Sequence, residues 1–237
     1  MTDWTTTIAS LTTGVGTLVL AFATFSAVRS ANRAARVAEE ALSVGLRPLL
    51  VPSRLDDVTQ KVFYGDGKFE RLEGGRGAAE IDRGNVYLGI SVRNAGRGIA
   101  VLHGWRFAAG QATDQSLPQA SHLAGGSPAL EVADQSRPRL DSFRPHSRDI
   151  LIAPNDVGFW QAAFRDAADP QYDEAADAVR KGGVLTIDVL YGDHEGGQRA
   201  ISRFLLRRPD VQQRPDQEPP WLASVVRHWN VDRPDPR

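Results

Sequence analysis

The chain has 237 residues, of which 41% are hydrophobic, 24% charged and 8% aromatic. It can therefore bury a core, and it is not a disordered chain as a whole. Its 28 basic and 29 acidic residues give a formal net charge of -1, which excludes a bulk electrostatic hold on nucleic acid. The absence of cysteine excludes disulfides, cysteine-bound metals and thiol nucleophiles.

An uncharged stretch runs from Thr5 to Val28, with Trp4 directly before it. About 20 apolar residues in a helix span the hydrocarbon core of a bilayer, and this stretch is slightly longer. The sequence therefore predicts a transmembrane segment over residues 1–28, with Trp4 as an aromatic anchor at the interface.

Two alternatives for this stretch stay open. A cleaved signal peptide fits the small residues around Phe22 but lacks the usual basic start, because Asp3 is the one charge before the stretch. A buried helix of a soluble protein is the other alternative.

Basic residues follow the stretch and none precedes it: Arg29, Arg33 and Arg36 come within eight residues of its end. Positive charges stay on the cytoplasmic side of a membrane span. We therefore expect a single-pass protein of the plasma (inner) membrane with its N-terminus outside and its C-terminal domain in the cytoplasm. The lipid bilayer is the first partner that the sequence implies.

Residues 29–46 are rich in alanine and contain no proline, and the next proline in the chain is Pro48. This pattern predicts a helical stalk that continues the span and ends at Gly45. Small residues recur along one side, from Gly14 and Gly16 to Ala41, and such a stripe lets helices approach closely. A homo-oligomer formed through the span and stalk is one hypothesis, and a solvated, monomeric stalk is the other.

Residues 47–208 predict an antiparallel β-sandwich of the broad immunoglobulin-like kind, with some seven short strands separated by turn signals. The clearest strands are expected at 85–94, 99–107, 149–153, 157–164, 184–191 and 198–206, with a further short strand at 129–133. Residues 65–84 are rich in glycine and are expected to form a loop. A short helix is expected at 169–180.

Residues 209–237 begin with a proline-rich linker. Trp221, Leu222, Val225 and Trp229 then recur at helical spacing, which predicts a short amphipathic helix docked on the sandwich. The expected fold class is mainly β: a transmembrane helix with a helical stalk, then the sandwich with one inserted helix and one C-terminal helix.

Three features together resemble a known group of proteins: the uncharged span with its arginine-rich stalk, the turn from Val92 to Ala100, and Leu190-Tyr191-Gly192-Asp193 before a hairpin. The chain resembles the uncharacterised single-pass membrane proteins with a β-sandwich domain that are common in high-GC bacteria. The resemblance implies a membrane-attached β domain and carries no known activity.

Catalytic motifs are missing from the sequence: there is no phosphate-binding loop, no dinucleotide fingerprint and no zinc-protease motif. The best cluster is Asp188, Asp193, His194 and Glu195 near a hairpin tip, which fits either a metal or general acid–base site or a solvated turn capped by Asp193. Arg97 stands between two glycines and fits either an anion contact or a structural ion pair.

From these observations we expect a membrane-anchored, non-enzymatic protein whose cytoplasmic domain binds a partner protein. No cofactor and no metal are expected. The alternatives are a membrane-tethered hydrolase that uses the Asp193–Glu195 loop, and an exported or cell-surface binding domain.

Overall fold

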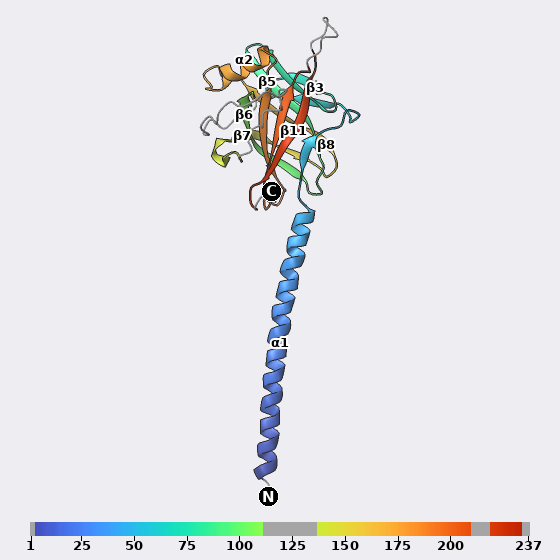
Figure 1. The fold of residues 1–237 in the computed structure, drawn as a ribbon, viewed down its shortest axis with the longest axis vertical. Coiled ribbons are helices and arrows are strands. Elements are labelled where there is room, and N and C mark those ends of the chain that lie inside the picture. Colours follow the sequence, from blue (N-terminus) through green and yellow to red (C-terminus); the bar gives the residue numbers. More distant parts are fainter. Residues whose placement is uncertain (1–2, 111–136, 210–218, 234–237) are drawn as a thin grey trace, which may run out of the picture. The chain divides into compact units, whose positions relative to one another are not determined.

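The computed structural model describes residues 3–110, 137–209 and 219–233, and the side chains of residues 3–15, 40 and 42–44 lie outside this described part. The chain divides into a helical unit, Met1–Gly45, and a β unit, Leu46–Arg237. Figure 1 shows both units.

The helical unit is one continuous helix, α1 (Asp3–Gly45). It ends at Gly45, three residues before Pro48, as the sequence predicts, because proline cannot continue a helix. Large apolar side chains are exposed along it, among them Leu18, Phe22 and Phe25. The Thr24 hydroxyl donates a hydrogen bond to the Leu20 carbonyl oxygen at 2.8 Å.

The expected membrane span, Thr5–Val28, lies within α1. In the described part of the chain, no helix is found that is long and apolar enough to cross a membrane.

The β unit is mainly β and antiparallel, as the sequence predicts. Its strands are β1 (Leu50–Pro52), β2 (Gln60–Phe63), β3 (Phe69–Leu72), β4 (Arg76–Asp82), β5 (Asn85–Asn94), β6 (Ala100–Ala109), β7 (Arg144–Ile152), β8 (Val157–Phe164), β9 (Leu185–Gly192), β10 (Ala200–Arg207) and β11 (Trp221–Asn230). A helix, α2 (Tyr172–Arg180), and a 3-10 turn, η1 (Leu140–Ser142), complete it.

Nine of the strands join one curled sheet in the order β1-β5-β4-β11-β10-β9-β6-β7, and β8 pairs with the free side of β5. Strands β2 and β3 form a separate hairpin. The described strands thus build one curled sheet with a small hairpin beside it (Figure 1). The expected immunoglobulin-like topology is not confirmed.

The core fills the concave side of the curled sheet, and its side chains alternate along the strands as period two requires. On β9, Leu185, Ile187, Val189 and Tyr191 all belong to the main hydrophobic cluster. Aromatic rings meet edge to face there: the ring of Trp105 lies 5.8 Å from that of Trp160 and 5.4 Å from that of Phe164, measured between centroids. This geometry is the favourable one for aromatic pairs.

Two predictions of secondary structure are wrong. Residues 65–84 contain β3 and β4, where a loop was expected. Tertiary pairing makes strands of these residues: β4 pairs with the strongly apolar β5 over six residue pairs, and Phe69 and Leu72 pair with β2. The weak β propensity of the glycine-rich stretch is overridden by its partners.

The predicted amphipathic helix at the C-terminal end is strand β11, paired along its length with β10. The register shifts between Arg203 and Phe204 of β10, so that Val226 has no partner. This bulge reverses the alternation of side chains: Trp221 joins the main core, whereas Trp229 packs on the opposite face over Arg203. Because of this reversal, Trp221 and Trp229 have a sequence spacing that is also typical of one face of a helix, although both belong to a strand.

The other elements lie close to their predicted positions, with boundaries that differ by a few residues. The strand expected at residues 129–133 lies outside the described residues. The strand expected at 149–153 begins earlier, at Arg144.

Candidate functional site

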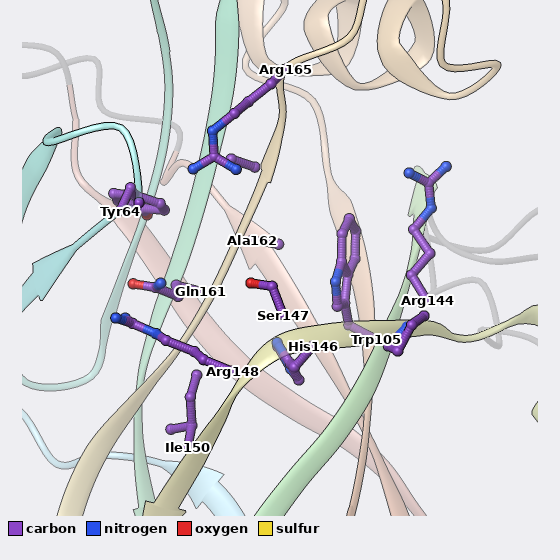
Figure 2. A pocket seen from close by; sticks show the side chains of 13 residues that line it. Tyr64, Trp105, Arg144, His146, Ser147, Arg148, Ile150, Gln161, Ala162 and Arg165 are labelled. Atoms are coloured by element: carbon purple, nitrogen blue, oxygen red, sulfur yellow. The ribbon is translucent and has the colours of Figure 1, made fainter.

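Among the described strands, β7 and β8 are both edge strands of the curled sheet. Within the described residues, β7 is hydrogen-bonded to β6 alone and β8 to β5 alone. A turn at residues 153–156 joins the two strands, and they diverge from it, as Figure 2 shows. The sheet therefore has an open seam between β7 and β8.

Packing closes the seam near this turn. Gly158 of β8 lies against the Ile152 side chain of β7, and a Cβ atom built at Gly158 would lie 2.8 Å from Cγ1 of Ile152. The Ile152 side chain would have to shift to admit a side chain there, so glycine favours close packing of the two strands at this point.

Arg144 crosses the far end of the seam. Its guanidinium binds the Asp169 carboxylate and donates a hydrogen bond from Nη2 to Oε1 of Gln171 at 2.9 Å. The central guanidinium carbon of Arg144, Cζ, lies 5.4 Å from the centre of the Trp105 ring and 5.1 Å from the centre of the Phe164 ring. Ion pairing and cation–π contact together fix this arginine across the gap.

A large bulge in β7 shapes the middle of the seam. Leu102 of β6 pairs with Ile150, and Gly104 pairs with Pro145. The segment 146–149 of β7 therefore stands opposite the single residue His103 of β6. Bulges bend a strand and redirect its side chains, and this one places three successive residues, 146–148, on the wall of a cavity.

The cavity between the edges has a volume of about 320 Å³, near the lower limit for sites that hold a small molecule. Tyr64, Trp105, Arg144, His146, Ser147, Arg148, Ile150, Gln161, Ala162 and Arg165 are among the residues that line it. In Figure 2 Ser147, Arg148 and Gln161 gather between the two edges, and Arg165 reaches toward them from the end of β8. No aspartate or glutamate is part of the lining.

Two polar atoms of the cavity wall are buried without a hydrogen-bond partner among the described residues. They are Nε2 of His146 and Oε1 of Gln161. Most buried polar atoms in proteins have a partner, and each exception calls for an explanation. Water or a ligand in the cavity would supply the missing partners.

Burial, together with smaller effects of the nearby Arg148 and His103, lowers the pKa of His146 from 6.5 to about 4. His146 is therefore neutral at neutral pH. Arg144 is paired with Asp169, and Arg165 with Asp66. Arg148 makes no ion pair within the described residues; its Nη2 donates to the Phe63 carbonyl oxygen at 3.1 Å.

The predicted Asp193–Glu195 cluster does not converge on one site. The Asp193 carboxylate accepts hydrogen bonds from the backbone N–H of Gly197 at 2.7 Å and of Gln198 at 3.3 Å. His194 and Glu195 are exposed in the same loop. The carboxylate thus caps the β9–β10 hairpin, which agrees with the second of the two interpretations. Among the described residues no group of side chains is arranged to hold a metal ion.

Arg97 is exposed, and within the described part of the chain its guanidinium makes no ion pair. Its two flanking glycines serve a close approach of the backbone. A Cβ atom at Gly96 or Gly98 would collide with the carbonyl oxygens of Arg47 or Leu46. The turn around Arg97 therefore packs directly against the residues that precede β1.

Arg29, Arg33 and Arg36 are exposed on α1. The side chain of Trp4 lies outside the described residues.

Asp188 does not join the Asp193 loop: it forms a buried ion pair, which sequence reasoning missed, on the face of the sheet opposite the main core. Asp188 and Arg203, opposite each other on β9 and β10, are each 1% exposed. Nε and Nη2 of Arg203 donate to the Asp188 carboxylate at 2.6 and 2.9 Å. Nη1 of Arg106 adds a third hydrogen bond at 3.2 Å.

A serine and a histidine also meet inside the sheet. Oγ of Ser202 lies 2.7 Å from Nδ1 of His228 and 2.9 Å from the Tyr191 hydroxyl, and it donates to the Leu50 carbonyl oxygen at 3.1 Å. Ser202 is 0% exposed, so a substrate has no access to it. We interpret this network as a structural link between β1, β9, β10 and β11.

Sequence reasoning also missed the cavity residues. Arg144, Pro145 and His146 fall outside the strands predicted from the sequence, and Arg148 and Arg165 carried no motif. The alternation of Arg144, His146 and Arg148 was the one signal that could have indicated a polar strand face.

Comparison of the chain with protein-family models, with curated proteins and with solved structures finds no match.

Proposed function

We propose that this protein is a membrane-anchored, non-enzymatic binding protein. In this proposal α1 inserts its uncharged stretch into the plasma (inner) membrane, and the β unit lies in the cytoplasm, where it binds a partner protein at the seam between β7 and β8. The resemblance to single-pass membrane proteins of high-GC bacteria agrees with this proposal.

The open seam is the observation that carries the binding proposal. A strand edge presents a row of backbone N–H and C=O groups, and another extended chain can pair with them. Here two such edges face one cavity, which has two buried polar atoms without a partner. A segment of a partner that enters the seam would satisfy both edges.

Three observations support the membrane anchor. The stretch Thr5–Val28 contains no charge, α1 is continuous through it, and its described apolar side chains are exposed. Thr24 bonds to its own helix, which is how threonine hydroxyls are satisfied in lipid. Arg29, Arg33 and Arg36 follow the stretch and favour the cytoplasmic orientation of the β unit.

A pair of variants tests the anchor. Replacing Leu18 and Leu20 by arginine places two charges inside the proposed span, at about 3 kcal/mol each near its centre. We expect the protein to move from the membrane fraction to the soluble fraction or to be degraded. The control replaces Val37 and Ala41 of the same helix by arginine, outside the span, and should stay with the membrane. Equal membrane fractions for both variants would contradict the anchor.

Reporter fusions after Arg237 test the orientation. A fluorescent protein that folds only in the cytoplasm should be bright, and an enzyme active only outside the inner membrane should be silent. The reverse pattern would place the β unit outside and favour the exported binding domain.

Photo-crosslinking in cells tests the seam. A photoreactive amino acid at Ser147, on the exposed edge of β7, should give one discrete adduct whose added mass mass spectrometry assigns to a protein. The same amino acid at Glu195, in the exposed β9–β10 loop, is the matched control and should give no such adduct. Identical products at both positions, or none at Ser147, would refute binding at the seam.

A further inference from the structure

We propose that the seam cavity binds a carboxylate group attached to an apolar body, with Arg148 as its main charged contact. The inference rests on the proposed function in one respect: it takes the seam as the binding site. It adds the chemistry of the group that is bound there.

The charge of the cavity wall is the first argument. Three arginines line the cavity and no acidic residue does. Asp169 neutralises Arg144 and Asp66 neutralises Arg165, whereas Arg148 has no carboxylate partner within the described residues. With His146 neutral, one positive charge remains uncompensated. A single negative charge matches it, which favours a carboxylate over a doubly charged phosphate.

The position of Arg148 is the second argument. Its Nη2 donates to the Phe63 carbonyl oxygen of β2 at 3.1 Å, so the exposed side chain reaches from β7 to β2 along the wall of the cavity. Its other donors have no partner among the described residues. A guanidinium held in this way can bind a carboxylate through two parallel hydrogen bonds.

The remaining lining fits the rest of such a ligand. The Ser147 hydroxyl and the Gln161 amide can donate hydrogen bonds, and Figure 2 shows both, with Arg148, between the two strand edges. Trp105, Ile150 and Ala162 supply an apolar wall. A volume of about 320 Å³ suits a small aromatic acid or a single acidic side chain of an extended peptide.

Two sources of the carboxylate are distinguished by the probes. Benzoate represents a free small acid, and benzamide is its neutral counterpart. A hexapeptide of alternating valine and glutamate represents an acidic segment of a partner, and the same peptide with glutamine is its neutral counterpart.

Binding to the full chain in detergent micelles is measured by calorimetry, and the site is located by the NMR signals of the Trp105 indole and the Ser147 amide.

We expect benzoate or the glutamate peptide to bind at least about tenfold more tightly than its neutral counterpart and to shift both signals. Arg148→Gln should remove this preference while the circular dichroism spectrum stays unchanged. Arg139→Gln, at an arginine whose side chain is 84% exposed and outside the cavity, is the control and should keep it. Tighter binding of benzoate indicates a free acid, and tighter binding of the peptide indicates a partner segment.

Several results would overturn the inference: no binding of either acid at tens of millimolar, equal binding of acid and neutral counterpart, an unchanged preference in Arg148→Gln, or a preference for inorganic phosphate. These results are separable from failure of the proposed function. A protein adduct at Ser147 without carboxylate binding would leave the proposed function in place and refute the inference alone.

Discussion

Oδ1 of Asn94 accepts a hydrogen bond from the backbone N–H of Leu49 at 3.1 Å and so fixes the main chain directly before β1. The same side chain also accepts from the Gly96 N–H, and its Nδ2 donates to the carbonyl oxygens of Gly98 and Ile152 at 2.7 and 3.1 Å. Asn94 is fully buried. One amide thus joins the turn after β5, the chain before β1 and the end of β7.

Replacing Asn94 by alanine should therefore lower the free energy of unfolding by about 3 kcal/mol, because buried backbone groups lose their partners. Urea unfolding followed by tryptophan fluorescence measures the change. Arg97→Ala, in the same turn but exposed, is the control and should change the stability by less than about 0.5 kcal/mol. Equal effects of the two substitutions would refute this role of Asn94.

Gly98→Ala should destabilise the β unit, because the added methyl group would collide with the Leu46 carbonyl oxygen. The loss should exceed about 2 kcal/mol, since the clash involves backbone on both sides. Gly65→Ala is a matched control: a Cβ at Gly65 meets no atom within 4 Å. Thermal unfolding of the two variants should differ clearly, and similar midpoints would contradict the close approach of the two segments.

Asp188→Ala should lower the free energy of unfolding by about 3–5 kcal/mol, because it leaves the buried guanidinium of Arg203 without its carboxylate. The double variant Asp188→Leu/Arg203→Met removes both charges and should recover most of the loss. Arg106 is partly exposed and stays hydrated in either case. Chemical unfolding of the single and double variants checks this prediction, and a double variant as unstable as Asp188→Ala would contradict it.

The stability should depend on His146 between pH 6.5 and pH 4. Its pKa is 6.5 in the unfolded chain and about 4 in the folded protein. As the pH falls through this range, the unfolded chain gains a proton that the folded protein does not, so the free energy of unfolding decreases. Carboxyls whose pKa is lowered by arginine, such as Asp169, contribute mainly below about pH 5.

Unfolding measured at pH 7 and pH 5 tests this dependence. His146→Gln should lose less stability on acidification than the unsubstituted protein, with a residual decrease from His103, whose pKa is also lowered by burial. His194→Gln, at an exposed loop position, should leave the dependence unchanged. If His146→Gln and the unsubstituted protein lose the same stability, His146 does not titrate as its burial implies.

Much of the local structure follows from the sequence alone. The continuous helix, its end at Gly45 and the strand at 85–94 were predicted, because helix propensity, terminator residues and alternation of apolar side chains are local properties. The role of Asp193 as a loop cap was one of two interpretations, since an aspartate beside glycines readily bonds to nearby backbone.

Tertiary structure alone decided the rest. The apolar residues of β11 have a helix-like spacing because a bulge against β10 reverses which side chains of β11 face the core. A bulge depends on the partner strand, so the sequence of β11 alone does not reveal it. The glycine-rich β4 is a strand because β5 pairs with it. The seam cavity joins Tyr64, Trp105, His146 and Gln161, which lie far apart along the chain. The order of strands in the sheet brings them together, and long-range pairing leaves no periodic pattern in the sequence.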